Sequence, residues 1–175
     1  MWWCGSALDA RTGPSQLWKA AKTKMSKTIR VLVVDDFETV RQWVRTRLDR
    51  TRFMVVGEAA NGREACRQAQ ELLPELILLD LNLPDMNGFE VLRQLCRGVP
   101  SAKVLFLSAY NDADMVRRAL EGGASGYVLK SEAQRELVPA MEVALCGKKF
   151  VSCCLVSPEE PLDSSLSKHQ FVDVT

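Results

Sequence analysis

Histidine is nearly absent from this sequence of 175 residues, which contains only His169. A single histidine near the C-terminus excludes a Ser-His-Asp triad, a multi-histidine metal site and a phosphohistidine in the folded core. The sequence also lacks a CxxC pair and a GxxxxGK motif, so its six cysteines are expected to be reduced thiols and a phosphate loop of that type is excluded. No apolar stretch is long enough to cross a bilayer and no secretory signal is visible, so we expect a cytoplasmic location.

Only the middle of the chain carries the periodicity of a folded domain, which we assign to residues 29–147. Residues 1–28 contain five basic residues and one acidic residue without a clear helical or strand period, and we expect a disordered extension there. Met25 is expected to be the true start of the protein. Residues 148–175 are expected to be a linker remnant and a flexible tail that exposes His169. The net charge of +1 gives no reason to expect binding to nucleic acid.

From residue 29 onward, short apolar runs alternate with segments of helical period. Apolar runs bounded by polar or turn residues are typical of buried strands in a parallel sheet. Strands that alternate with helices predict a doubly wound α/β fold, and we expect five parallel strands in the order 2-1-3-4-5. The expected strands are 29–35, 53–58, 75–80, 103–108 and 126–130, and the expected helices are 38–50, 62–72, 87–97, 112–121 and 132–147.

Several residues give local predictions about helix starts and turns. Pro139 would remove a hydrogen bond from the last helix, which predicts either a kink or, more economically, a helix that begins in earnest near Val138. Gly88 and Gly126 are interpreted as turn glycines. Side-chain caps are expected at three helix starts, formed by Asn61 with Glu64, by Asn111 or Asp112, and by Ser131 with Gln134.

Polar side chains stand at the ends of four of the apolar runs. Asp35 and Asp36 end the first run, Asp80 the third, Ser108 the fourth and Lys130 the fifth. In doubly wound sheets, ligands bind outside the carboxyl ends of the strands. Three carboxylates, a hydroxyl and an ammonium are therefore predicted to converge at one edge of the sheet.

These groups suit phosphoryl chemistry with a divalent metal. Carboxylate oxygens suit Mg²⁺, which Asp36 and Asp80 could bind directly, with Asp35 behind them or acting through water. Such an ion would let a phosphoryl group approach Asp80, whose carboxylate is a suitable nucleophile for an aspartyl phosphate. Lys130 would supply a positive charge, and Ser108 a neutral donor, beside a phosphoryl oxygen.

Four motifs in this order resemble a known family. They are Val31–Asp36, Leu78–Gly88, Leu107–Ala109 and Gly126–Lys130, and together they resemble the receiver domain of bacterial two-component response regulators. The resemblance extends over about residues 29–152. It implies that Asp80 is the phosphoacceptor. It also implies that Mg²⁺ is bound by Asp36, Asp80 and the backbone carbonyl of Asn82, with assistance from Asp35.

The resemblance further implies a switch and a set of partners. Lys130 and Ser108 would contact the phosphoryl group, and Tyr127 would turn inward when Ser108 is drawn toward it. The donor would be a histidine kinase or a histidine phosphotransfer protein. The chain would then act by switching its contacts with a downstream protein, not as an enzyme. On phosphorylation we expect a homodimer through the fourth helix, fifth strand and fifth helix.

The residues around Gly126 also resemble the subgroup whose receivers precede a LuxR-type helix-turn-helix domain. Only 23 residues follow Ser152, which is too few for a domain of that kind. We therefore expect a receiver without its output domain, either standing alone or truncated, and no direct binding to DNA.

Two other functions remain open from the residues alone. A magnesium-dependent phosphohydrolase with an aspartyl intermediate would use the same carboxylates. Against it, Asn82 stands where a second acid would follow Asp80, and no substrate cap is evident. A non-phosphorylated interaction module would keep the fold without the chemistry, but the intact site residues disfavour that function.

Overall fold

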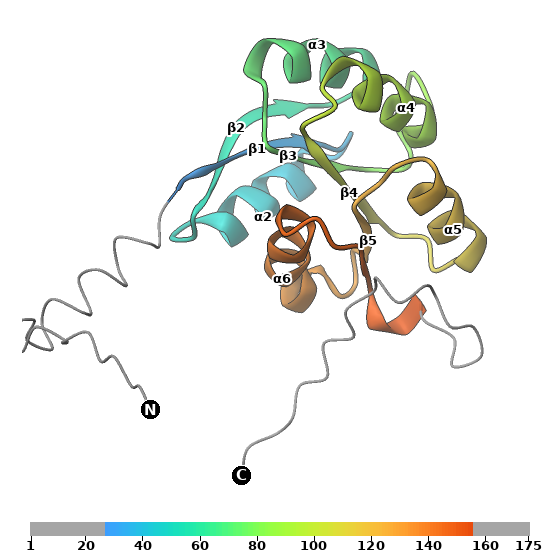
Figure 1. Cartoon of the computed structure of the whole chain (residues 1–175). Coiled ribbons are helices and arrows are strands. Elements are labelled where there is room, and N and C mark those ends of the chain that lie inside the picture. Colours follow the sequence, from blue (N-terminus) through green and yellow to red (C-terminus); the bar gives the residue numbers. More distant parts are fainter. Residues whose placement is uncertain (1–26, 156–175) are drawn as a thin grey trace, which may run out of the picture.

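A six-stranded parallel sheet with helices on both faces forms the centre of the molecule (Figure 1). The structure, a computed structural model, describes residues 27–155. The sheet order is β2-β1-β3-β4-β5-β6, so the predicted fold class and the predicted order of the first five strands are confirmed. The strands are β1 (Ile29–Val34), β2 (Phe53–Ala59), β3 (Leu76–Leu79), β4 (Lys103–Ser108), β5 (Gly126–Leu129) and β6 (Phe150–Val151). The helices are α2 (Glu38–Leu48), α3 (Gly62–Leu72), α4 (Gly88–Gly98), α5 (Ala113–Glu121), α6 (Ala133–Leu145) and the 3₁₀ turn η1 (Cys153–Leu155).

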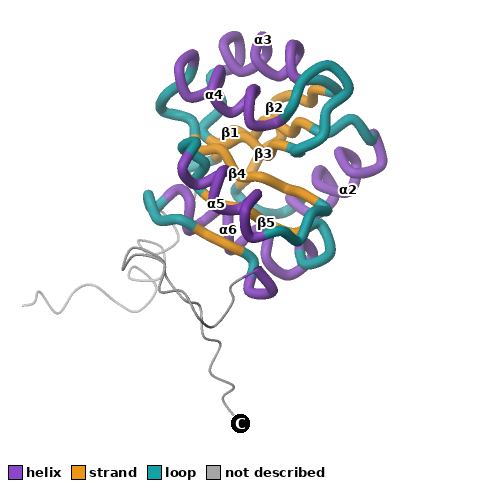
Figure 2. The backbone as a smooth tube through the Cα atoms, turned by 90° about the vertical axis from the view of Figure 1, so that its right-hand side faces the viewer, coloured by secondary structure: helices purple, strands orange, loops and turns teal. Residues whose placement is uncertain are grey.

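The helices form two layers around the sheet (Figure 2). Helices α3, α4 and α5 share one core cluster with Leu32 and Phe106, whereas α2 and α6 share the other with Val33 and Leu105. Successive residues of a strand point to opposite faces, so neighbours such as Leu32 and Val33 enter different layers. Because both faces are covered, Leu76–Leu79 is buried along its whole length, which explains the uninterrupted apolar runs in the sequence.

Two of the predicted helix caps are present. Asn61 Oδ1 accepts a hydrogen bond from the backbone N–H of Glu64 at 2.9 Å, and Asp112 caps α5 through two backbone N–H groups. The cap predicted from Ser131 with Gln134 is wrong. The residue before α6 is Glu132, and no side chain caps that helix start.

Pro139 lies inside α6, so the prediction that this helix begins near Val138 is wrong. The helix begins six residues before the proline, at Ala133. Proline in a helix interior costs about 3 kcal/mol. The buried face of α6, which includes Leu137, Ala140 and Met141, offsets that cost.

The sixth strand, β6, was not predicted from the sequence. Phe150 and Val151 pair in parallel with Gly126 and Tyr127 of β5. Both residues of β6 lie in the segment 148–175, which the sequence analysis assigned to the linker and tail. A strand of two residues is too short to produce a periodic signal, and it forms because β5 offers an open edge. The folded part of the chain therefore continues past residue 147.

Some expectations fall outside the described part of the chain. They concern most of the extension 1–28, Met25 as the start, and the tail with His169. Within residues 27–155, no helix combines the length and apolar character needed to cross a membrane.

Candidate functional site

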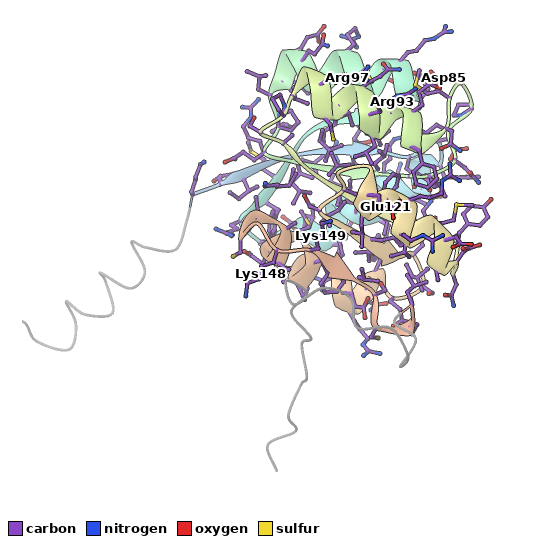
Figure 3. The ribbon with its side chains drawn as sticks, turned by 45° about the vertical axis from the view of Figure 1, so that its right-hand side comes forward. Asp85, Arg93, Arg97, Glu121, Lys148 and Lys149 are labelled. Atoms are coloured by element: carbon purple, nitrogen blue, oxygen red, sulfur yellow. The ribbon has the colours of Figure 1, made fainter. Side chains whose placement is uncertain are left out.

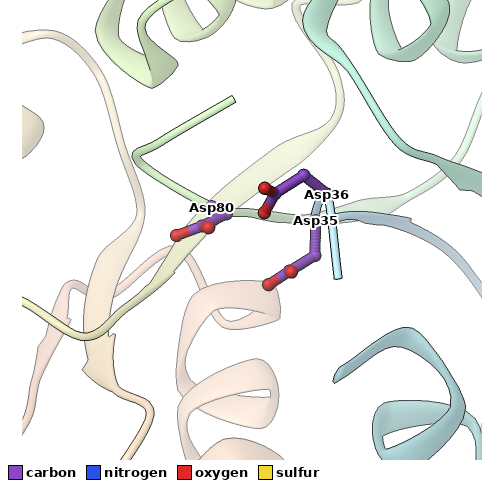
Figure 4. A group of neighbouring side chains, drawn as sticks. All are labelled: Asp35, Asp36 and Asp80. Atoms are coloured by element: carbon purple, nitrogen blue, oxygen red, sulfur yellow. The ribbon is translucent and has the colours of Figure 1, made fainter. Parts of the chain in front are cut away.

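Three carboxyl groups meet at the carboxyl edge of the sheet (Figure 4). Asp35 and Asp36 directly follow β1, and Asp80 directly follows the neighbouring strand β3. One carboxylate oxygen of each residue lies within 4.8 Å of the others. Asp35 and Asp80 are buried, whereas Asp36 is exposed. The sheet order brings these residues together because β1 and β3 are adjacent although more than forty residues separate them in the chain.

Lys130 joins two of these carboxylates from the end of β5. Its Nζ atom lies 2.7 Å from Asp35 Oδ2 and 3.1 Å from Asp80 Oδ2. Burial by itself favours the neutral amine, but the two carboxylates outweigh it, so the pKa of Lys130 is raised above its ordinary value. The ammonium is therefore a fixed positive charge between two acids.

Asp80 is held in an environment that disfavours its charge. Its Oδ1 atom accepts a hydrogen bond from Leu81 N at 2.7 Å. Burial raises the pKa of Asp80, and the Lys130 ammonium offsets this only in part. A second cation beside Asp80 would relieve the remaining cost of the buried carboxylate.

Asp35 is positioned by two local contacts. Its Oδ1 atom accepts the Phe37 backbone N–H at 2.9 Å, and its backbone carbonyl accepts Arg41 Nη1 at 2.7 Å. The other oxygen, Oδ2, is buried and lies 2.7 Å from the Lys130 ammonium. Arg41 therefore supports the acidic loop through the Asp35 backbone.

The donor set fits a magnesium ion. Hard oxygen ligands from one or two carboxylates, completed by water, are the usual protein contribution to Mg²⁺. Asp35, Asp36 and Asp80 supply one carboxylate oxygen each, and these oxygens lie within 4.8 Å of one another. Asn82, the fourth expected ligand, lies two residues beyond Asp80 in the loop before α4.

Gly88 lies against the Asp80 loop, and it is not the turn glycine that the sequence suggested. It is the first residue of α4, and its N–H donates to Leu81 O at 2.8 Å. A Cβ atom at this position would lie 2.6 Å from the backbone oxygen of Asp80. Glycine is therefore required because α4 starts in contact with the phosphoacceptor candidate's own backbone.

Tyr110 connects the remaining site residues, and sequence reasoning missed it. Its backbone N–H donates to Ser108 Oγ at 3.2 Å, and its carbonyl accepts the Tyr127 hydroxyl at 3.0 Å. Its own hydroxyl accepts Asn82 Nδ2 at 2.6 Å. In the sequence, only its position two residues after Ser108 could have indicated that Tyr110 belongs to the site. Tyr110 thus links the loop after β3 with both of the predicted switch residues.

Tyr127 lies in the inward position, with its side chain fully buried. Its ring packs near Phe106 at a centroid distance of 6.0 Å, and burial raises the pKa of its hydroxyl. Ser108 is also fully buried, one strand away on β4.

Comparison with known proteins identifies the family. The sequence pattern of the response regulator receiver domain matches residues 31–142. The chain belongs to this family. Receiver domains of response regulators are generally phosphoacceptors in two-component signalling, not enzymes in the usual sense, and they bind Mg²⁺ through an acidic pocket.

Full-length relatives of this receiver extend beyond the matched region. The chain is 41% identical over 122 residues to response regulator protein VraR of Staphylococcus aureus, covering 69% of this chain and 58% of VraR. It is 36% identical over 125 residues to response regulator GacA of Pseudomonas viridiflava, covering 71% of this chain and 58% of GacA. The chain therefore spans well under two thirds of the length of these relatives.

A solved structure supports the same family assignment. The receiver resembles a LuxR-family two-component response regulator from Aurantimonas sp. SI85-9A1 with a TM-score of 0.70 and 35% identity. The match covers 74% of this chain and 93% of that chain. The predicted resemblance to receivers of the LuxR-type subgroup is in keeping with this relative.

Proposed function

We propose that this receiver accepts a phosphoryl group on Asp80 and passes the signal on by changing its protein contacts. The observation that carries the proposal is the position of Lys130 Nζ, 2.7 Å from Asp35 and 3.1 Å from Asp80, beside three converging carboxylates. That arrangement provides a nucleophile, a metal-binding edge and a fixed cation at one point.

The proposed reaction is transfer from a phosphohistidine. A carboxylate oxygen of Asp80 forms a bond to phosphorus while the phosphorus–nitrogen bond of the donor breaks, and the electron pair returns to the imidazole. Lys130 neutralises charge on a phosphoryl oxygen, and Ser108 donates a hydrogen bond to another. Mg²⁺, when bound, would neutralise the remaining charge. Its proposed ligands are Asp36, Asp80 and the backbone carbonyl of Asn82, with Asp35 assisting.

The proposed partners follow from this chemistry. The donor is a histidine kinase or a histidine phosphotransfer protein, and the setting is the cytoplasm. We take residues 29–147 as the main body of the receiver domain, which β6 and η1 complete. The output surface is the face formed by α5, β5 and α6, through which a phosphorylated homodimer would form. Movement of Tyr127 together with Ser108 would link that face to Asp80.

The decisive experiment is labelling by acetyl phosphate with and without Mg²⁺. We expect a Mg²⁺-dependent product on the wild-type chain that is stable to acid and cleaved by hydroxylamine, and no product on Asp80→Asn. Asp49→Asn, which changes an exposed aspartate outside the site, is the matched control and should label normally. Absence of label on a folded wild-type chain would overturn the proposal.

The same experiment separates the two other functions. Release of many phosphate molecules per chain from a small phosphoester would favour a phosphohydrolase. A chain that takes no label, yet binds its partner equally well with Asp80→Asn, would be a non-phosphorylated interaction module.

A further inference from the structure

The segment after α6 returns to the edge of β5 and is held there by several contacts. Lys149 Nζ donates to the backbone oxygen of Leu120 at 3.2 Å, which ties the segment to the end of α5 (Figure 3). Phe150 N donates to Ser125 O at 3.1 Å, at the start of the β5–β6 pairing. After the strand, Leu155 is buried in the core cluster that contains Tyr127. The segment is therefore part of the folded domain.

Ser152 forms the last link of this segment to β5. It is fully buried, although serine is a polar residue that usually lies at the surface. Its backbone N–H donates to Tyr127 O at 3.0 Å. Its side-chain Oγ accepts the backbone N–H of Leu129 at 2.9 Å. The hydroxyl thus takes the place of the backbone carbonyl that a longer β6 would have offered to Leu129.

These bonds complete a clamp around the end of β5. On the β4 side, the backbone N–H of Lys130 donates to Ser108 O at 2.8 Å. On the β6 side, Ser152 Oγ receives the preceding N–H, that of Leu129. Two successive amides are therefore fixed from opposite sides. A buried N–H without an acceptor is costly, so removal of the Ser152 hydroxyl would make the end of β5 move toward another acceptor or water.

We infer that Ser152 is a positioning residue for Lys130: by holding the Leu129 amide, it sets where the Lys130 ammonium stands between Asp35 and Asp80. The inference rests on the proposed function, in which that ammonium receives a phosphoryl oxygen. Ser152 does not touch the reacting atoms. It acts through one residue of backbone, from a segment that the sequence pattern assigned to the linker.

Two variants and a control test the inference in the full-length chain. Ser152→Ala removes the hydroxyl, and Ser152→Thr keeps it. Val99→Ala is a control that destabilises a buried site after α4. Val99 precedes β4 and so lies toward the amino ends of the strands, whereas Asp80 lies at their carboxyl ends. One measurement is the rate of phosphorylation by acetyl phosphate at saturating Mg²⁺, well below the melting temperatures. The other is the rate at which acetic anhydride modifies the Lys130 amine, read by mass spectrometry without phosphorylation.

We expect Ser152→Ala to slow phosphorylation by about tenfold, because a misplacement of about 1 Å can cost about a hundredfold and the expected displacement of Lys130 is smaller. We also expect acetic anhydride to modify Lys130 several times faster in that variant. Ser152→Thr should restore both rates, and Val99→Ala should change neither. Unchanged modification of Lys130 in Ser152→Ala would overturn the inference, as would a loss of rate that Val99→Ala reproduces.

The two proposals fail in different ways. A wild-type chain that takes no phosphoryl group defeats the proposed function, because that measurement involves no change at Ser152. The modification rate of Lys130 still decides the inference in that case. Rapid modification in Ser152→Ala that Ser152→Thr reverses would uphold the positioning of the ammonium.

Discussion

Replacement of Lys130 by methionine tests the electrostatic balance of the site most directly. At an effective dielectric constant of about 20, its contacts of 2.7 Å and 3.1 Å correspond to attractions of about 6 and about 5 kcal/mol. The free-energy cost of removing these ions from water cancels much of this attraction. Removal of one partner from a buried ion pair nevertheless costs about 3–5 kcal/mol, because the other charge stays buried. We expect Lys130→Met to lower the free energy of unfolding by about 3 kcal/mol at pH 7 without Mg²⁺.

The loss should depend on pH in a defined direction. Burial raises the pKa of Asp80 in the folded chain, and loss of the Lys130 charge raises it further. An acid with a raised folded pKa destabilises the fold fully above that pKa, and the penalty disappears as the pH falls through it. The difference in stability between the variant and the wild type should therefore shrink from pH 7 toward pH 4.

Urea unfolding with and without Mg²⁺ measures these effects. A divalent ion at a hundred times its dissociation constant stabilises the folded state by about 2.7 kcal/mol, so Mg²⁺ should recover much of the loss. Lys103→Met, at the amino end of β4 and away from the carboxylates, is the matched control and should behave like the wild type. Equal stability of Lys130→Met and the wild type at pH 7 without Mg²⁺ would refute the reasoning.

Three further predictions follow from individual contacts. Tyr110→Phe removes the hydroxyl that accepts a hydrogen bond from Asn82 Nδ2. Such a bond contributes under about 1 kcal/mol, so its loss should shorten the lifetime of the phosphorylated state about threefold, measured as decay of label. Mg²⁺ affinity should fall as the pH drops through the raised pKa of Asp80, because the protonated carboxyl is a poor ligand; a titration that is flat from pH 7 to 4 would contradict this. Pro139→Ala restores an N–H able to bond with the Arg135 carbonyl, and should raise the free energy of unfolding in urea by about 2 kcal/mol.

The strand ends were predictable because burial and chemistry change at the same residue. Leu76–Leu79 is apolar since both faces of the sheet are covered, and Asp80 breaks the pattern where the chain leaves the sheet. The known order of strands in such folds then brings Asp80 beside Asp35. Their meeting was inferred from topology, and the roles of these residues in phosphoryl transfer stay predictions.

Other features depend on contacts that leave no periodic signal. Strand β6 has two residues and forms only because β5 offers a partner. Tyr110 acts through backbone groups, which almost every residue has, and through a hydroxyl whose partner, Asn82, lies in another loop. The prediction that the last helix begins near Val138 relied on the low preference of proline for helix interiors. The packing of α6 overrides that preference.

The hydrogen bonds of β5 connect the chemistry to the surface. The backbone of Tyr127 pairs with Val151 of β6, its carbonyl accepts Ser152 N–H, and its side chain reaches Tyr110 beside the Asp80 loop. A change at Asp80 that moves Ser108 or Tyr110 therefore alters a strand whose outer edge is occupied by β6. Since α5, β5 and α6 form the proposed output face, β6 lies within that face. A partner that docks on the proposed face would meet β6 together with β5, so we expect the segment after α6 to take part in the proposed signal.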